Sequence, residues 1–299
     1  MKQQIKSSLI LLLTATIWGV AFVAQSVGME YIGPFTFNAI RCVLGGLVLI
    51  PVILVLKKKK ETGAENQEKE DKKTLWAGGI ACGVILCIAS NLQQFGIMEA
   101  SVGKSGFFTA LYIVMIPVIG IFIGKRPGIK LWFCVALAVV GMYLLCMKDG
   151  SFTIERADIM LLLCALAFSF HILVVDYFSP KVDGVKMSCI QFFVCGVLSA
   201  VGMLFTETLD ISNIQAAWLP LLYAGLLSCG VGYTLQIVGQ KGINPVIASL
   251  IMSLESVISA LAGWVILGQV LSPKEILGCI LMFVAIIITQ IPIGNKKTD

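Results

Sequence analysis

Long apolar stretches separated by short polar breaks set the pattern of this chain. Each stretch is about 20 residues long, which is the length that a helix needs to cross the hydrocarbon core of a bilayer. The breaks carry turn and helix-start signals, such as Gly33–Pro34, Asn244–Pro245 and Ser272–Pro273. The pattern therefore predicts an all-α polytopic membrane protein with ten transmembrane helices, at Ser8–Val27, Phe35–Leu56, Leu75–Phe95, Ser105–Ile123, Ile129–Met147, Ala157–Tyr177, Met187–Phe205, Ala217–Val238, Pro245–Leu267 and Pro273–Ile291.

Other architectures fit the pattern less well. Irregular chain in lipid is excluded because each unpaired backbone group there costs several kcal/mol. Strands of a membrane barrel would alternate apolar and polar positions, whereas these stretches are apolar on all sides. The composition agrees, since 58% of the residues are hydrophobic and 13% are charged, against about 45–50% and about 25% in soluble domains.

The longest polar segment runs from Lys57 to Lys73 and consists largely of lysines and acids. It cannot bury a core, so we expect a disordered cytoplasmic linker over residues 57–73. The lysine cluster at its start serves as a topology determinant in our interpretation, and a role in binding lipid is the alternative.

The distribution of lysine and arginine predicts the orientation. With the N-terminus inside, seventeen of these residues lie on the inner side, and four, Lys104, Lys148, Arg156 and Lys274, lie on the outer side. Cytoplasmic loops carry such an excess, so we expect a multi-pass protein of the cell membrane, embedded in the lipid bilayer, with both termini cytoplasmic. The net charge of +5 is spread over these loops, which does not suggest a nucleic-acid partner.

The two halves of the chain share short similarities in the same order and at nearly constant offsets of about 150, 142 and 144 residues. They pair Leu11–Ala15 with Leu161–Ala165, Asn91–Gln94 with Thr234–Gln236, and Ile123–Gly124 with Leu267–Gly268. These similarities predict two repeats of five helices each, over residues 1–147 and 157–292. Because five is odd, the second repeat enters the membrane from the opposite side, so the repeats are inverted. Inverted repeats are common in secondary transporters, where the site lies near the membrane midplane between them.

Several short motifs carry a family resemblance: Trp18–Gly19, the stretch Phe37–Arg41, Leu254–Glu255, and Gly263–Gln269. Through them the chain resembles the EamA-type branch of the drug/metabolite transporter superfamily over nearly its whole length. The resemblance implies ten helices in two inverted five-helix repeats, and export or import of small metabolites, including amino acids and drugs. The family commonly has proline after the glutamate and glutamate after the closing glycine, where this chain has Ser256 and Gln269.

Two charged residues fall inside the predicted spans. Charges there are costly and usually face a cavity or a partner. Arg41 offers a planar fork of donors that suits a substrate carboxylate. The interpretation that we favour is a structural arginine, either paired with Glu255 or capped by carbonyls and snorkelling outward. Glu255 is a candidate for a proton-binding residue that couples transport to a proton gradient, and a role in helix packing is the alternative. His171, the sole histidine, is a second coupling candidate, although the interpretation that we favour for it is a packed neutral ring bonded to a carbonyl.

Polar and aromatic side chains concentrate in the third, fourth, eighth and ninth predicted spans. Ser105, Thr109 and Tyr112 follow the spacing of one helix face, and so do Ser249 and Ser253. A polar face in lipid must look inward, at a cavity or at another helix. We interpret these residues as the lining of a substrate cavity, with interhelical hydrogen bonding alone as the alternative; the candidates for substrate binding are Trp18, Arg41, Asn91, Gln94, Ser105, Phe108, Thr109, Tyr112, Tyr233, Gln236, Ser249 and Ser253.

Signatures of enzymes are missing from the sequence, which has no HExxH helix, GxSxG elbow or P-loop. One histidine without an acidic cluster predicts no metal site, and we expect no cofactor. The leading hypothesis is a secondary transporter that moves a small-molecule substrate by alternating access. A sugar or nucleotide-sugar exchanger, a channel-like pore and a non-transporting scaffold subunit are the alternatives, and the sequence leaves monomer or homodimer open.

Overall fold

The computed structural model describes residues 2–62, 71–100, 102–124, 127–146, 155–268 and 271–291, and the regular secondary structure of these residues is entirely helical. In the first part of the chain the helices are α1 (Lys2–Gly28), α2 (Pro34–Thr62), α3 (Lys72–Glu99), α4 (Val102–Ala110), α5 (Tyr112–Phe122) and α6 (Ile129–Cys146). In the second part they are α7 (Arg156–Phe178), α8 (Gly184–Thr206), α9 (Ile211–Ala216), α10 (Trp218–Leu222), the π-helix η1 (Tyr223–Tyr233), α11 (Thr234–Gln240), α12 (Pro245–Met252), α13 (Glu255–Leu267) and α14 (Pro273–Gln290).

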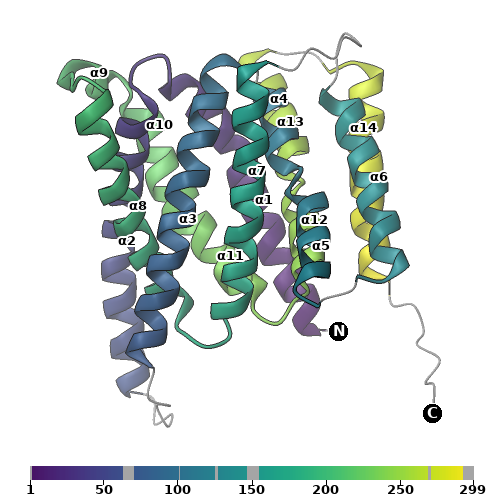
Figure 1. Cartoon of the computed structure of the whole chain (residues 1–299), viewed down its shortest axis with the longest axis horizontal. Coiled ribbons are helices and arrows are strands. Elements are labelled where there is room, and N and C mark those ends of the chain that lie inside the picture. Colours follow the sequence, from purple (N-terminus) through teal and green to yellow (C-terminus); the bar gives the residue numbers. More distant parts are fainter. Residues whose placement is uncertain are drawn as a thin grey trace.

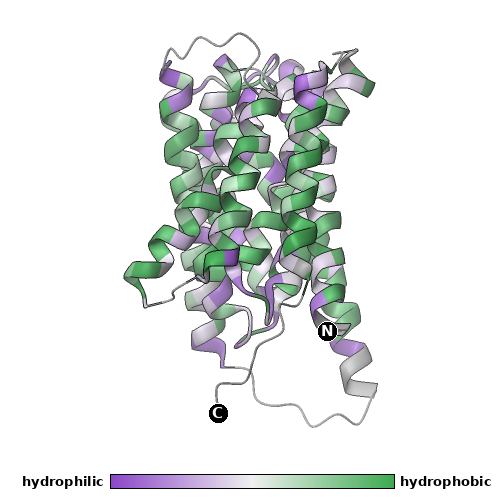
Figure 2. Cartoon of the chain, turned by 90° about the vertical axis from the view of Figure 1, so that its right-hand side faces the viewer, coloured by the Kyte–Doolittle hydropathy of each residue, from purple (hydrophilic) through white to green (hydrophobic). Residues whose placement is uncertain are grey.

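The long helices stand side by side as a bundle, with the N-terminus at the lower end in Figure 1. Eight segments of the described chain are long and apolar enough to cross a membrane. The other two predicted spans correspond to α6 and α14, which are 18 residues long each and pack against one another. Hydrophobic residues dominate the middle of the bundle and hydrophilic residues gather toward its ends (Figure 2). The chain is therefore a multi-pass helical membrane protein.

Side-chain caps explain why helices begin at the predicted breaks. The carboxylate of Asp183 accepts from the backbone N–H of Val185, in the first turn of α8. Asn244 caps α12 in the same way, and Pro245 at the first helical position has no N–H to leave unpaired. The first backbone N–H groups of a helix have no partner inside the helix, so these caps fix where each helix starts.

The helices α2 and α3 extend into the segment that was expected to be a linker. α2 continues as far as Thr62 and α3 starts at Lys72, leaving residues 63–70 outside the described residues. Lysine and glutamate are good helix formers, so α2 continues as a helix beyond its apolar part.

Two predicted spans are broken near their middles. α4 and α5 divide the fourth span at Leu111, whose N–H bonds the carbonyl of Phe108 at 3.2 Å. α12 and α13 divide the ninth span, where the N–H of Leu254 bonds the carbonyl of Ile251 at 3.2 Å. Both bonds reach back three residues, so the same tightened turn interrupts both spans. In Figure 1, α4 and α13 lie in the upper half of the bundle, and α5 and α12 in the lower half.

Glycines allow the long helices to approach closely. A Cβ atom on Gly79 would lie 2.5 Å from the side chain of Ile190, and one on Gly83 would lie 2.6 Å from that of Val194. Side chains at these two positions would push α3 away from α8. The contact matters for the site because α3 carries cavity residues, as described below.

Candidate functional site

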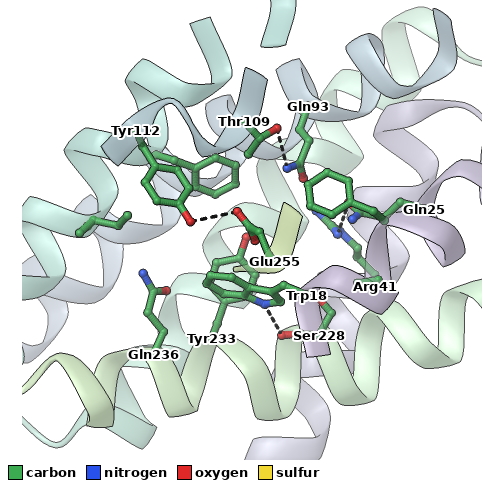
Figure 3. A pocket seen from close by; sticks show the side chains of 14 residues that line it. Trp18, Gln25, Arg41, Gln93, Thr109, Tyr112, Ser228, Tyr233, Gln236 and Glu255 are labelled. Atoms are coloured by element: carbon green, nitrogen blue, oxygen red, sulfur yellow. Dashed lines mark hydrogen bonds between the residues drawn. The ribbon is translucent and has the colours of Figure 1, made fainter. Parts of the chain in front are cut away.

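A buried cavity lies where the broken spans meet the long helices (Figure 3). Its free volume of about 30 Å³ is room for two or three water molecules, since one ordered water needs roughly 10–15 Å³. The side chains around it come from α1, α2, α3, α4, α5, α7, η1, α11 and α13. They are Trp18, Ala21, Phe22, Gln25, Arg41, Gln93, Thr109, Tyr112, Phe168, Ile172, Ser228, Tyr233, Gln236 and Glu255.

Arg41 is the cationic residue of this cavity. It is only 2% exposed, and its Nη1 donates to Gln25 Oε1 at 2.9 Å. Its guanidinium carbon lies 5.7 Å from the centre of the Phe37 ring, within range of a cation–π interaction. The Nε of Arg41 has no hydrogen-bond partner among the described residues. The guanidinium therefore keeps an unused donor at a site shielded from solvent.

Glu255 is the acidic residue of the cavity and is 4% exposed. The hydroxyl of Tyr112 donates to its Oε1 at 3.0 Å (Figure 3). Glu255 is the first residue of α13, and Tyr112 is the first residue of α5. Each break thus places one polar side chain at the cavity.

Arg41 and Glu255 line the same cavity, yet no ion pair joins them within the part of the chain that the structure describes. The alternative in which these two residues pair with each other is therefore wrong for this conformation. Both side chains are held by neutral partners, Gln25 and Tyr112. The cavity therefore holds one basic and one acidic side chain that are not paired with each other.

Aromatic rings and the π-helix form one wall of the cavity. The ring centres of Trp18 and Tyr233 lie 4.6 Å apart. The indole Nε1 of Trp18 donates to the carbonyl of Ser228 at 3.4 Å, and both Ser228 and Tyr233 belong to η1. Helices of the π type occur often at functional sites because they redirect side chains and free backbone groups.

The glutamines complete the polar lining. Gln93 Nε2 donates to Thr109 Oγ1 at 3.4 Å. Gln236 is 1% exposed, and its Oε1 has no partner among the described residues. Gln236 lies across the cavity from Arg41 in Figure 3. The lining therefore combines an unused acceptor on one side with an unused donor on the other.

Seven of the residues singled out in the sequence come together here: Trp18, Arg41, Thr109, Tyr112, Tyr233, Gln236 and Glu255. Seven others do not line the cavity: Asn91, Gln94, Ser105, Phe108, His171, Ser249 and Ser253.

The predicted residues outside the cavity are buried and make other contacts. Asn91 accepts from Asn38 at 2.9 Å and donates to Ser199 at 3.1 Å. Ser249 and Ser253 donate to carbonyls within their own turns. His171 Nε2 lies 3.1 Å from Gln191 Oε1, the arrangement of a packed histidine. In these places interhelical or local hydrogen bonding accounts for the polar side chain.

Other lining residues were not among the sequence candidates, namely Ala21, Phe22, Gln25, Gln93, Phe168, Ile172 and Ser228. Gln25 was the most detectable of them, because it is a polar residue one helical turn beyond Phe22 in an otherwise apolar span. The apolar residues Ala21 and Ile172 carry no signal that separates a cavity wall from ordinary core.

A helical membrane bundle with a small polar cavity at its centre defines the class of membrane transporters, and the comparisons specify the family. The sequence profile of the EamA-like transporter family matches residues 5–147 and again residues 155–291. The chain therefore belongs to the EamA-like transporter family, and it is a transporter rather than an enzyme.

Relatives and a solved structure agree with this assignment. An uncharacterized transporter of Archaeoglobus fulgidus is 27% identical over 282 residues, covering 94% of this chain and 84% of the relative. The uncharacterized transporter YwfM of Bacillus subtilis is 24% identical, covering 97% of this chain and 96% of the relative. A crystal structure that is 17% identical superposes with a TM-score of 0.77 over 95% of this chain and 96% of the other, and so has the same fold.

Proposed function

We propose that the protein is a secondary transporter that moves small zwitterionic metabolites, such as amino acids, across the cell membrane by alternating access. The observation that carries this proposal is the presence of Arg41 and Glu255, both buried, in one cavity without an ion pair between them. A solute with a carboxylate and an ammonium group would offset both charges at once. The faces of Trp18 and Tyr233 suit an ammonium group.

Alternating access requires two exchangeable halves, and we propose ten helices in two inverted repeats over residues 1–147 and 157–292. The helix boundaries support this division. The ends of α1 and α7, at Gly28 and Phe178, are separated by 150 residues, and so are the starts of α2 and α8. The starts of α4 and α12, at Val102 and Pro245, are 143 residues apart, and so are the starts of α5 and α13.

The cavity repeats the same offsets. Two pairs of cavity residues are 150 residues apart, namely Trp18 with Phe168 and Phe22 with Ile172. Two further pairs are 143 residues apart, namely Gln93 with Gln236 and Tyr112 with Glu255. All eight residues line the cavity. The arrangement supports a site at the interface of two repeats, with matching positions on each side of a pseudo-twofold axis. We further propose that both termini are cytoplasmic, so that the upper end in Figure 1 faces outward.

In this proposal Glu255 also binds the coupling proton. Its carboxylate is exposed to the substrate and to one side of the membrane at a time, so a proton and an ammonium group would compete for it. Arg41 binds the substrate carboxylate throughout the transport cycle.

The alternative functions fit the cavity less well. A nucleotide-sugar exchanger has to bind phosphates, and Arg41 is the sole cationic residue of the lining. A channel-like pore needs a continuous path, whereas this cavity is a small separate hollow of about 30 Å³ that has to widen before it takes a solute, as alternating access requires. Saturable flux with counter-transport in liposomes would support the carrier, whereas flux that does not saturate would support the pore, and no flux with any solute would support a scaffold.

The substrate class is tested by thermal unfolding of the purified protein. Ligands stabilise by mass action, so each amino acid is compared with the amine that lacks its carboxylate and the acid that lacks its ammonium group. We expect amino acids to raise the unfolding temperature of the parent more than either analogue. Arg41→Gln should remove the advantage over the amine, and Glu255→Gln the advantage over the acid. Equal stabilisation by the amine or the acid would contradict a zwitterionic substrate.

A further inference from the structure

An ion-paired cluster joins the two proposed repeats at the upper end of the bundle. Lys104 Nζ lies 3.0 Å from Asp158 Oδ1 and 2.9 Å from Glu155 Oε2. Lys104 is in the first turn of α4, and the two acids flank the first turn of α7. The side chain of Asp158 is 2% exposed and that of Lys104 25% exposed. We call Lys104, Glu155 and Asp158 the latch.

An apolar plug lies between the latch and the cavity. It consists of the buried cluster Phe22, Val23, Ile97, Val102 and Ala262, from α1, α3, α4 and α13. Phe22 also lines the cavity, and Val102 is only two residues from Lys104. The upper end of the cavity is therefore closed twice, first by hydrophobic packing and then by an ion pair.

The lower end differs at the matching positions. Under the proposed repeat, Val23 corresponds to Leu173 and Val102 corresponds to Pro245. Leu173 and Pro245 line a separate hollow of about 90 Å³ between α5, α7 and α12. Two of the five plug positions are thus matched by residues that border a hollow at the lower end.

We propose that this conformation is closed to the outside and part-way open to the inside, and that the latch is the outer gate of the transporter. The proposal rests on the inverted repeats and the orientation of the proposed function. When the halves exchange conformations, α4 separates from α7, the plug opens and the latch breaks. The hollow at the lower end closes at the same time.

The latch has no charged counterpart at the inner end. Lys104 corresponds to Ile247, Asp158 to Ser8, and Glu155 to Ile5. An ion pair therefore stabilises the outward-closed conformation, whereas the three corresponding inner positions carry no charged side chains that could form the same pair in the mirror image. Because Asp158 is buried, loss of Lys104 leaves a carboxylate without its cation, which costs more than loss of an exposed pair. In the absence of substrate, the latch therefore favours the conformation that is closed to the outside.

Thiol labelling from each side of the membrane tests this proposal without any substrate. The reporter Ala262→Cys is placed in the plug, and the reporter Leu173→Cys in the hollow. An impermeant thiol reagent is added to intact cells for the first and to inside-out vesicles for the second, with the parent chain as the background of native cysteines. We expect Lys104→Gln to raise the labelling rate of Ala262→Cys roughly five- to tenfold. Labelling of Leu173→Cys should fall in the same variant.

Two further variants make the result specific. Lys274→Gln removes a lysine of the predicted outer side that is not in the latch and should leave both rates unchanged. Lys104→Arg keeps a cation opposite the two acids and should leave both rates at the parent values. If Lys104→Gln fails to fold, Lys104→Arg is compared with Asp158→Asn instead.

Two results would contradict the proposal that the latch is the outer gate. One is unchanged labelling in Lys104→Gln, and the other is a rise at Ala262→Cys without a fall at Leu173→Cys. The second outcome would mean that α4 merely loosens. Since no substrate is used, a latch that behaves as expected while the amino-acid panel gives no stabilisation would refute the substrate class alone.

Discussion

Tyr112 and Glu255 stand 143 residues apart in the chain and meet at the centre of the cavity through a hydrogen bond of 3.0 Å. In a carrier with the proposed repeats they occupy equivalent positions. In that proposal each residue takes the place of the other when the repeats exchange conformations, so Tyr112 and Glu255 stay in contact. We therefore expect this contact to be preserved through the transport cycle, whereas the latch breaks.

The first prediction concerns that preserved contact. Tyr112→Phe removes a buried hydrogen bond to the carboxylate of Glu255 and should lower the free energy of unfolding by about 1.5–3 kcal/mol. Because the contact exists in both conformations, the rates of inward and outward exchange in liposomes should fall by the same factor. Tyr31→Phe, at a residue that is 40% exposed, is the control. A fall in one direction alone would show that the contact belongs to one conformation.

The second prediction concerns coupling. Glu255→Gln keeps the size of the side chain and removes its charge and its titration. We expect the variant to fold and to exchange substrate across liposomes, but not to accumulate substrate under an imposed pH difference. Accumulation equal to that of the parent would exclude Glu255 as the coupling residue, whereas failure to fold would favour a structural role.

The third prediction concerns orientation. A cysteine at Asn66, in the lysine-rich segment, should resist an impermeant thiol reagent added to intact cells. A cysteine at Ser212, an exposed residue of α9 at the upper end of the bundle, should react under the same conditions. The opposite pattern would invert the proposed topology, and with it the sides assigned to the latch and the hollow.

The fourth prediction concerns stability. The carboxylate of Glu207 accepts from the backbone N–H groups of Phe35 and Thr36 at 2.8 Å each, and so caps α2 from the end of α8. Glu207→Ala leaves these donors unpaired and should reduce the free energy of unfolding by roughly 1–3 kcal/mol. Glu99→Ala, at an exposed acid near the end of α3, should change it by less than about 0.5 kcal/mol. Equal losses in the two variants would show that the cap has no special effect.

The sequence was sufficient for the helical class, most span positions and part of the cavity. Apolar length and positions of proline, glycine and capping residues locate the helices, because lipid forces every backbone group into a helix. Arg41 and Glu255 could be predicted to lie at a cavity because they are charged residues inside spans, and such residues are too costly to face lipid.

The remaining site residues depend on geometry that the sequence does not specify. The breaks at Leu111 and at Ser253–Leu254 contain no proline or glycine, so no local signal marks them. Ser105 and Tyr112 lie on opposite sides of the break at Leu111, and only Tyr112 lines the cavity, although their spacing places them on one face of a regular helix. Polar residues such as Asn91 and His171 lie next to cavity residues in sequence, but each residue along a helix turns by about 100°, which directs these two side chains at neighbouring helices.

The π-helix η1 has a consequence for how substrate preference can change during evolution. A π-type turn holds more residues than an α-type turn, and such turns occur as bulges inside otherwise α-helical segments. Deleting one residue from the stretch Tyr223–Tyr233 would return it toward α geometry, because an α-helix covers the same turn with fewer residues. The side chains of Ser228 and Tyr233, which lie in this stretch and line the cavity, would change position, while Gln236 and the rest of the bundle stayed in place. A single-codon deletion or insertion in this stretch is thus a short mutational route from one transported solute to another.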